Sequence, residues 1–319
     1  MAKAVQMFPQ ATKLLVPKLR TVAVEPTNHC NLSCKMCYSN RRKKGHMSLN
    51  LFKKVVKELA TDFPRVNLGL SYGGESLLHP QFHEMLRYAS SARSQAALGS
   101  IGFNTNGMLL NDATTNILVT LPADWVIVSL EGLGNVNDAI RIGCNYETVK
   151  ANILNLAEKR NDSPKPEISI NLTHSTQTQE QVDQFVNYWA DHVDYVRVSG
   201  CLTENLEITI DRFFGNYEIQ ENRFCTWPFG YMAVLWNGDV VACCQDMNGQ
   251  NILGNINTQT IKQVWSAKPF RAFRYAQVKN SFPCGKCTVW KPHFKLQTIP
   301  IGNLSMSLLG QSKQYKKCR

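Results

Sequence analysis

The sequence predicts an α/β fold in which six parallel strands alternate with helices, followed by a smaller C-terminal region. Two observations predict the first part: strand-like and helix-like stretches alternate between residues 20 and 200, and several polar loops each follow a strand. A third observation sets the second part off, because the pattern beyond residue 200 changes to short β-like pieces with four spaced cysteines. A chain of 319 residues is long enough for one sizeable domain and a smaller appendage.

The predicted elements begin after a lead-in over residues 1–19. The first strand, Thr21–Glu25, ends at a cysteine loop; a charged linker over residues 41–44 follows, and then Ser48 caps an amphipathic helix. Further strands are expected near 66–71, 99–104, 124–130, 166–173 and 194–199, and helices near 80–92, 110–120, 145–160 and 178–191. Parallel sheets bind ligands at the carboxyl ends of their strands, so the loops at those ends are the candidate site.

The loop after the first strand carries the strongest chemical signal. Cys30, Cys34 and Cys37 are spaced C-x3-C-x2-C, and Tyr38 follows directly. Thiolates select iron–sulfur clusters, zinc or copper. A cubane cluster normally takes four thiolates, so three of them leave one iron open to a substrate. The alternative is structural zinc, which needs four closed ligands, and His29 is the nearby residue of that kind.

Three polar loops follow the next strands. They are Tyr72-Gly73-Gly74-Glu75, Asn104-Thr105-Asn106-Gly107 and Ser129-Leu130-Glu131-Gly132. The glycines permit a close backbone approach to a ligand, and Glu75 has the charge to accept hydrogen bonds from an amine. Asn104 and Ser129 suit ribose hydroxyls or a carboxylate, or they cap the following helices. Arg141 suits a carboxylate, with a surface ion pair as the alternative.

A second cysteine set lies in the C-terminal region. Its members are Cys225, Cys243, Cys284 and Cys287, and residues 229–243 predict a hairpin with a two-residue Asn237-Gly238 turn that brings the first two together. Four thiolates suit zinc or a fully ligated cubane. Of the other cysteines, Cys144 and Cys201 suit core packing, Cys318 lies in the tail, and Cys244 alternates with Cys243 in the predicted strand.

These motifs resemble those of the radical S-adenosylmethionine (SAM) enzymes over residues 20–200, which implies a partial (β/α)6 TIM barrel. The resemblance implies a 4Fe–4S cluster with one open iron on Cys30, Cys34 and Cys37. It places the methionyl amine of SAM at the glycine loop and the rest of SAM near further residues. Those SAM-binding positions are Tyr38, through its backbone, Gly73, Gly74, Glu75, Asn104, Ser129 and Arg141. Glu131 is a departure, since many relatives carry Asp there.

The region from 201 to 295 resembles a SPASM/Twitch auxiliary-cluster domain of the same superfamily. Its spacing is C-x12-G-x4-C, with a later C-x2-C, and the further cysteines of a second auxiliary cluster are lacking. The resemblance therefore implies one auxiliary 4Fe–4S cluster on Cys225, Cys243, Cys284 and Cys287, as in a Twitch dehydrogenase of aminocyclitol biosynthesis. Related epimerases use a cysteine as hydrogen donor, which makes Cys244 a candidate catalytic residue.

Charge and composition indicate which kinds of partner the protein has. The net charge is +11, and residues 247–319 contain twelve Lys or Arg and no Asp or Glu. This field favours an anionic group, with a solvated basic tail over 296–319 as the alternative. No stretch approaches the roughly 20 apolar residues of a membrane span, and eleven cysteines without a signal peptide suit metal ligands, so a cytoplasmic protein without a membrane partner is expected.

The resemblance implies that an external one-electron reductant such as flavodoxin or ferredoxin drives cleavage of SAM to a 5′-deoxyadenosyl radical, which abstracts a substrate hydrogen. The first hypothesis is dehydrogenation or epimerisation of a small polar metabolite, such as an amino sugar or aminocyclitol; only 29 residues precede Cys30, which disfavours a separate peptide-recognition domain. The second is maturation of a ribosomally made precursor peptide. The third is a non-catalytic zinc- or RNA-binding protein. Further candidates for pocket residues are His174, Arg197 and Glu204, with a structural or solvated role as the alternative.

Overall fold

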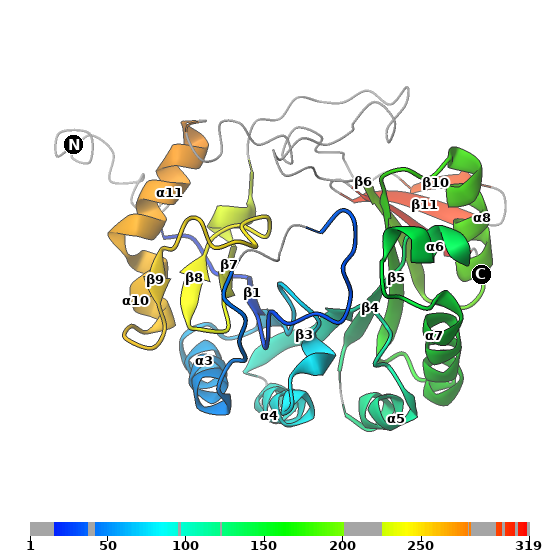
Figure 1. Ribbon diagram of the computed structural model, residues 1–319. Helices are drawn as coiled ribbons and strands as arrows, with labels where there is room; N and C mark the ends of the chain where they lie inside the picture. Colours follow the sequence, from blue (N-terminus) through cyan, green and yellow to red (C-terminus); the bar gives the residue numbers. More distant parts are fainter. Residues whose placement is uncertain are drawn as a thin grey trace. The chain divides into compact units, whose positions relative to one another are not determined.

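The computed structural model describes residues 16–37, 42–94, 97–121, 123–200, 225–279, 281, 298–301, 304–309 and 312–317. The chain divides into two compact units, and each is described by itself (Figure 1). The first unit comprises Met1–His29, Ser39–Ile101 and Phe224–Lys286. The second comprises Cys30–Tyr38, Gly102–Arg223 and Cys287–Arg319. The loop with the three N-terminal cysteines and the strand that precedes it therefore fall in different units.

The first unit contains a five-stranded sheet section in the order β2-β1-β7-β8-β9. Its strands are β1 (Thr21–Val24), β2 (Val66–Gly69), β7 (Tyr231–Val234), β8 (Asp239–Val241) and β9 (Gly254–Asn255). β1 pairs parallel with both β2 and β7, whereas β8 runs antiparallel to β7 and to β9. The C-terminal cysteine region thus extends the sheet beside β1, where Val22, Val24, Met232 and Val234 are fully buried.

Helices with one apolar face cover this section. They are α3 (Leu49–Asp62), α4 (Phe82–Ser94), α10 (Ile261–Ser266) and α11 (Lys268–Val278). Ser48 caps α3 as predicted, accepting from the Leu51 amide at 3.2 Å, and the helix buries Leu51, Val55 and Leu59. α10 is tied to α3 because the Ile261 amide donates to the Glu58 carboxylate at 2.7 Å.

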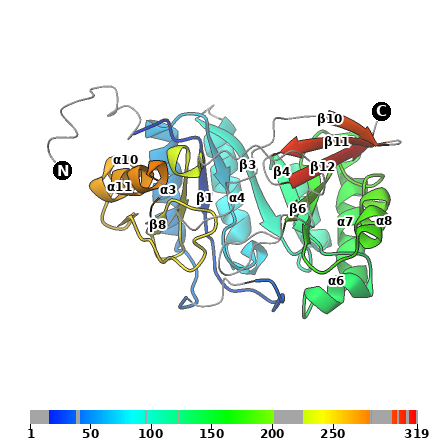
Figure 2. The ribbon, with the colours of Figure 1, turned by 90° about the horizontal axis from the view of Figure 1, so that it is seen from above.

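The second unit contains strands in the order β3-β4-β5-β6-β12-β11-β10. β3 (Leu98–Thr105), β4 (Trp125–Ser129), β5 (Glu167–His174) and β6 (Tyr195–Gly200) are the predicted strands, and their pairing from Gly102 onward is parallel. The helices are α5 (Asp112–Thr120), α6 (Asn135–Ile140), α7 (Tyr146–Arg160) and α8 (Gln179–Trp189). α7 and α8 lie along the same face of β5 and β6 (Figures 1 and 2).

Residues expected to form a basic tail contain three strands. β10 (Thr298–Ile301), β11 (Leu304–Leu309) and β12 (Ser312–Lys317) form an antiparallel meander, and β12 pairs antiparallel with β6 (Figure 2). The period-two pattern of Leu304, Met306 and Leu308 indicates a strand, although the lysine-rich composition favoured a tail. Short α6 was also missed, since six residues carry little periodicity.

The predicted hairpin is confirmed, but its turn is longer than expected. Leu235 still pairs with Asp239, donating its amide to that carbonyl at 2.8 Å, so the turn comprises residues 236–238 instead of two residues. Gly238 occupies its left-handed position at φ +89°, which a three-residue turn requires. In the described part of the chain, no helix has the length and apolarity to cross a membrane.

Candidate active site

In the first unit, the segments before and after the cysteine loop are hydrogen-bonded to each other. We call residues 25–28 and 42–47 the stem. The Thr27 hydroxyl donates to the Gly45 carbonyl at 2.8 Å, and the Met47 amide donates to the Pro26 carbonyl at 2.7 Å. The Asn28 side chain donates to one backbone group of the opposite segment and accepts from another. The cysteine loop therefore begins and ends at a rigid base.

The cysteine loop itself belongs to the second unit, where backbone hydrogen bonds support it. The amides of Ser33 and Lys35 donate to the carbonyls of Ile142 and Ile140 at 2.9 and 3.0 Å. The Asn106 side chain donates to the Asn31 side chain at 2.7 Å. Sequence reasoning singled out Asn104 in this turn and missed Asn106, which is the residue bonded to the loop. Hydrogen bonds from backbone and side-chain groups of the second unit therefore hold the loop in place.

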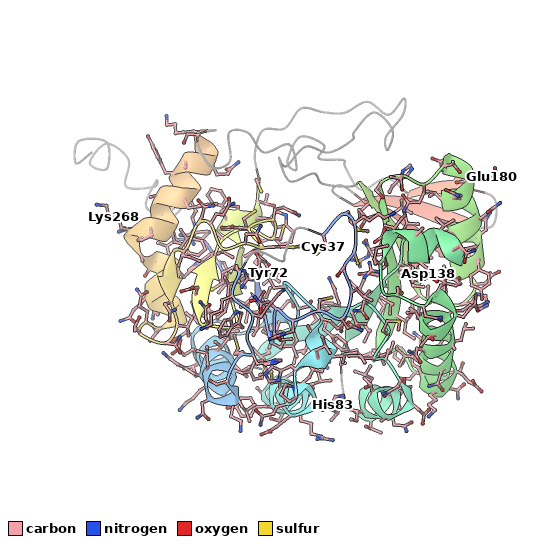
Figure 3. The ribbon with its side chains drawn as sticks, viewed as in Figure 1. Cys37, Tyr72, His83, Asp138, Glu180 and Lys268 are labelled. Atoms are coloured by element: carbon pink, nitrogen blue, oxygen red, sulfur yellow. The ribbon has the colours of Figure 1, made fainter. Side chains whose placement is uncertain are left out.

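The three cysteines of this loop form no disulfide. Cys30 and Cys37 are exposed and Cys34 is half-buried (Cys37 is labelled in Figure 3). Burial raises the pKa of the Cys34 thiol to about 11, and the Arg141 cation partly offsets this. Among the described residues, no three His, Cys, Asp or Glu side chains converge as a metal-binding group.

A buried ion pair lies on the segment that supports the loop. Arg141 Nη1 donates to Glu131 Oε1 at 3.1 Å, and Glu131 Oε2 accepts from the Thr173 amide at 2.7 Å. Burial raises the pKa of Glu131 to about 7, although Arg141 and the Thr173 amide lower it. Burial alone disfavours the Arg141 cation, but Cys34 and Glu131 together raise its pKa. Arg141 Nε is buried and has no hydrogen-bond partner among the described residues. The surface ion pair that was the alternative for Arg141 is thus wrong in its location: the pair is buried, and it has a spare donor.

The glycine loop after β2 is in the first unit. Gly74 has φ +74°, and a Cβ there would lie 2.4 Å from the His29 carbonyl oxygen, so only glycine fits. The Glu75 amide donates to that same carbonyl at 2.7 Å. The buried Glu75 carboxylate accepts from the Leu77 amide at the start of the 3-10 helix Ser76–Leu78. The close approach that the glycines permit is to the residues directly before Cys30.

The remaining predicted positions are placed as follows. Asn104 is exposed near the end of β3, Ser129 is the last residue of β4, and His174 is the last of β5. Arg197 lies within β6, where burial lowers its pKa. Tyr38, Cys201, Glu204, Cys284, Cys287 and Cys318 lie outside the described residues.

Two cysteines of the second set, and Cys244, are described. Cys225 and Cys243 are half-buried in the first unit. β8 ends at Val241, so Cys243 and Cys244 lie in a turn, and the strand alternation predicted for them is wrong; the Gln245 amide instead donates to Cys243 Sγ at 3.4 Å. Cys244 packs against the apolar cluster that contains Ala23 and Tyr231. The Tyr72 hydroxyl donates to the Cys243 carbonyl at 2.7 Å (Tyr72 is labelled in Figure 3).

The basic residues of α10 and α11 are not all on the surface. Lys268 and Arg271 are exposed (Lys268 is labelled in Figure 3), but Arg274 is fully buried. Its guanidinium lies 3.9 Å from the Trp265 ring centroid and donates to the Pro228 carbonyl at 2.9 Å. Burial lowers the pKa of Arg274 to about 9. Arg274 therefore stabilises the core of the first unit, and the surface charge of this region is smaller than composition suggests.

Comparison with known proteins identifies the class. The chain belongs to the radical SAM superfamily, which matches residues 24–194, more than half of its length. Residues 225–288 match the SPASM family, an iron–sulfur cluster-binding domain. The predicted family and fold class, an α/β partial barrel followed by an iron–sulfur domain, are thereby confirmed. The protein is an enzyme, and its class uses 4Fe–4S clusters and SAM.

Curated relatives match parts of the chain. A probable GTP 3′,8-cyclase of Methanococcus maripaludis is 29% identical over 194 residues, which are 60% of this chain and 59% of that protein. The chain spans between 32% and 59% of the length of the curated relatives that it matches.

Solved structures share the fold at low identity. The crystal structure of BtrN in complex with AdoMet and 2-DOIA superimposes with a TM-score of 0.56 at 20% identity, covering 81% of this chain and 87% of that one. Streptococcus suis SuiB bound to the precursor peptide SuiA gives a TM-score of 0.66 at 16% identity, with 85% and 69% coverage.

Proposed function

We propose that this enzyme uses a cluster on Cys30, Cys34 and Cys37 to cleave SAM and to abstract hydrogen from a substrate carbon. The observation that carries the proposal is that one supported loop holds three cysteines outside disulfides, and that the arginine on its supporting segment, Arg141, is buried with a spare donor. The residues fit the cofactors: a cubane held by three thiolates leaves one iron for SAM. The spare Arg141 Nε suits a carboxylate.

The chain's own residues position and shield the reactants. When bound, the reduced cluster and SAM supply the electron and the 5′-deoxyadenosyl radical that removes a hydrogen atom from the substrate. Arg141 orients the methionyl carboxylate, and Glu131 holds the guanidinium in place. Gly73, Gly74 and Glu75 are proposed to bind the methionyl amine. Asn104 and Ser129 are proposed to lie near the ribose or the methionyl part, and the Tyr38 backbone to contact the adenine. Each assignment extends the family resemblance to a single position of this chain.

Within this chemistry we assign a small polar metabolite, such as an amino sugar or aminocyclitol, and dehydrogenation or epimerisation as the reaction. The likeness to BtrN, whose structure contains 2-DOIA and is covered over 87% of its length, supports this choice. A cluster on Cys225, Cys243, Cys284 and Cys287 would accept the electron left on the substrate in a net oxidation. The proposed domains are a lead-in at 1–19, the barrel at 20–200, the auxiliary region at 201–295 and the basic segment at 296–319.

A precursor peptide is the second candidate substrate. The likeness to SuiB bound to SuiA favours it, since that complex has the higher TM-score, 0.66 against 0.56. In both cases the partners are an external one-electron reductant, such as flavodoxin or ferredoxin, and an anionic group at the exposed lysines and arginines of the C-terminal region. If a precursor peptide is the substrate, the enzyme modifies that peptide. If an amino sugar is the substrate, every peptide is left unchanged.

The test of the proposed function is formation of 5′-deoxyadenosine by the reconstituted full chain under anaerobic reducing conditions. Cys34→Ala should abolish it. Cys144→Ala is the matched control, because Cys144 is another free, half-buried thiol of the second unit and lies outside the ligand set. Formation of 5′-deoxyadenosine at the normal rate by Cys34→Ala would refute the assignment.

Cys244 is proposed as hydrogen donor if the reaction is an epimerisation. Cys244→Ala should then still cleave SAM but leave the substrate radical unquenched, which stoichiometry of 5′-deoxyadenosine to product would detect. Unchanged stoichiometry would remove Cys244 from the mechanism.

A further inference from the structure

Glu25 is a fully buried carboxylate that the motifs did not single out. It follows the last residue of β1, and its side chain is 0% exposed. Arg42 Nη1 donates to Oε2 at 2.9 Å, and Arg42 Nη2 donates to Oε1. The Gly73 amide donates to Oε1 at 3.1 Å, and the Trp236 amide donates to Oε2 at 3.1 Å. Each carboxylate oxygen thus accepts two hydrogen bonds, which fills its capacity.

The four donors come from three separate segments of the first unit. Arg42 belongs to the stem, Gly73 to the glycine loop, and Trp236 to the turn between β7 and β8. Arg42 also donates through Nε to the Met247 carbonyl at 2.6 Å, beyond the Cys243–Cys244 turn. Arg42 of the predicted charged linker is therefore only 13% exposed, and it is hydrogen-bonded to both Glu25 and Met247.

Two further contacts join the same segments. The Tyr72 hydroxyl bonds the Cys243 carbonyl, as described above, and Tyr72 immediately precedes Gly73. A Cβ at Gly45 of the stem would lie 2.5 Å from the Trp236 ring, so the indole packs directly on the stem backbone. The hairpin that leads to Cys243 is therefore held at its turn by Glu25 and Gly45, and beyond its second strand by Tyr72 and Arg42.

We infer that Glu25 and Arg42 are positioning residues for the auxiliary cluster: they fix the Cys243 segment to the glycine loop and to the stem of the radical-generating loop. This inference rests on the proposed function, because it takes Cys243 as a cluster ligand. A rigid link of this kind sets the position of the auxiliary cluster relative to the base of the SAM site. It also holds a fixed charge pair beside the ligand segment, and fixed charges and hydrogen bonds tune cluster potentials.

The first test measures the link without relying on catalysis. Amide hydrogen exchange is compared between the reconstituted full chain and Arg42→Met, in peptides that cover residues 71–76 and 235–247. Arg42→Met removes the hydrogen bonds to Glu25 and to the Met247 carbonyl. Amide exchange should therefore accelerate about tenfold in both peptides together. The matched control is Arg160→Met, since Arg160 is 14% exposed and pairs with Asp194 in the second unit. Acceleration confined to one of the two peptides, or seen equally in the control, would overturn the link.

The second test measures the cluster itself. In the Cys34→Ala background, the auxiliary cluster is read alone by electron paramagnetic resonance during a redox titration. Arg42→Met should shift its midpoint potential and its g-values, and Arg42→Lys, which keeps the charge and loses the fork, should shift them less. Gly45→Ala is a second variant that keeps every charge and displaces the Trp236 ring, so a spectral change is expected there too.

The outcomes separate this inference from the proposed function. A chain that carries no second cluster contradicts the proposed function. A second cluster whose potential and g-values are the same in Arg42→Met, Gly45→Ala and the unmodified chain contradicts only the positioning role of Glu25 and Arg42.

Discussion

Among the described residues, each unit contains one buried Glu–Arg pair whose glutamate lies one or two residues beyond a strand. The two pairs differ in how completely they are hydrogen-bonded. Glu25 in the first unit accepts four hydrogen bonds, and every nitrogen of the Arg42 fork is used. Arg141 in the second unit makes a single contact to Glu131, and its Nε has no partner in the described part of the chain. We call Glu25–Arg42, which is fully hydrogen-bonded, the closed pair, and Glu131–Arg141, which has a spare donor, the open pair.

This difference separates a structural role from a binding role. A buried charge pair costs desolvation free energy that only complete hydrogen bonding recovers, so a saturated pair such as Glu25–Arg42 can hold segments together. An incompletely bonded arginine is stabilised further by a ligand that supplies the missing acceptor. In the proposed function the open pair binds the cofactor, and the closed pair holds the scaffold.

The largest expected effect is on the free energy of unfolding, which should fall more when the closed pair is broken than when the open pair is broken. Arg42→Met should lower the free energy of unfolding by about 3–5 kcal/mol, because it leaves the Glu25 charge buried without its cation. Arg141→Met should cost only about 1–2 kcal/mol, since Glu131 has a pKa of about 7 and can become protonated. Chemical denaturation of the two variants checks this order. Equal losses would break the distinction between the closed and the open pair.

The second prediction concerns SAM affinity. Arg141→Met should weaken SAM binding by about ten- to hundredfold, because a charge-assisted hydrogen bond contributes about 1.5–3 kcal/mol. Isothermal titration of the anaerobic, reconstituted chain measures the dissociation constant. Glu131→Gln, which keeps the arginine and weakens its support, should lie between the variant and the unmodified chain. Affinity unchanged in Arg141→Met would mean that the open donor serves another ligand.

The third prediction uses the raised pKa of Glu131. A folded-state pKa of about 7, above the ordinary value of 4.5, means that the folded protein binds the proton more tightly. The resulting stability is fully present below pH 4.5 and is lost as the pH rises through 7. Relative to Glu131→Gln, the unmodified chain without SAM should therefore lose about 2 kcal/mol of unfolding free energy between pH 5 and pH 8. Parallel profiles for the two proteins would contradict the raised pKa.

The smallest expected effect compares a glycine of each unit. Gly74 and Gly134 both have left-handed φ, +74° and +52°, but a Cβ meets the His29 carbonyl at Gly74 and nothing within 4 Å at Gly134. Gly74→Ala should therefore lower the free energy of unfolding by about 1–2 kcal/mol more than Gly134→Ala does. Thermal unfolding measures the difference, and equal values would show that the glycine loop of the first unit adapts to a side chain.

The order of elements could be predicted from sequence because it depends on local patterns. Ser48 and its helix, the six strands and the polar loops after them follow from periodicity and capping, and the structure confirms them. The hairpin was also found, since Asn-Gly between alternating stretches is a strong signal. Its turn length was wrong because Asp239 pairs with Leu235 and not with Trp236, and this register is set by the strands and not by the turn residues.

The closed pair could not be predicted because it depends on contacts between distant segments. Glu25 was taken as the end of a strand and Arg42 as part of a charged linker, and neither residue alone indicates burial. The donor from Trp236 is 211 residues away from Glu25, and no local pattern reports such a contact. Asn106 was missed for the same reason, since its partner Asn31 lies 75 residues earlier. Arg141 was found because the family resemblance pointed to it.

The number and location of iron–sulfur clusters test the central claim most directly. Iron and sulfide analysis with Mössbauer spectroscopy of the reconstituted full chain should give about eight irons, as two 4Fe–4S clusters. Replacing Cys30, Cys34 and Cys37 together by alanine should leave about four irons, and replacing Cys225 and Cys243 should leave the other four. A chain that binds zinc and no iron, or that keeps both clusters after either replacement, would contradict the assignment of this enzyme's two cysteine sets.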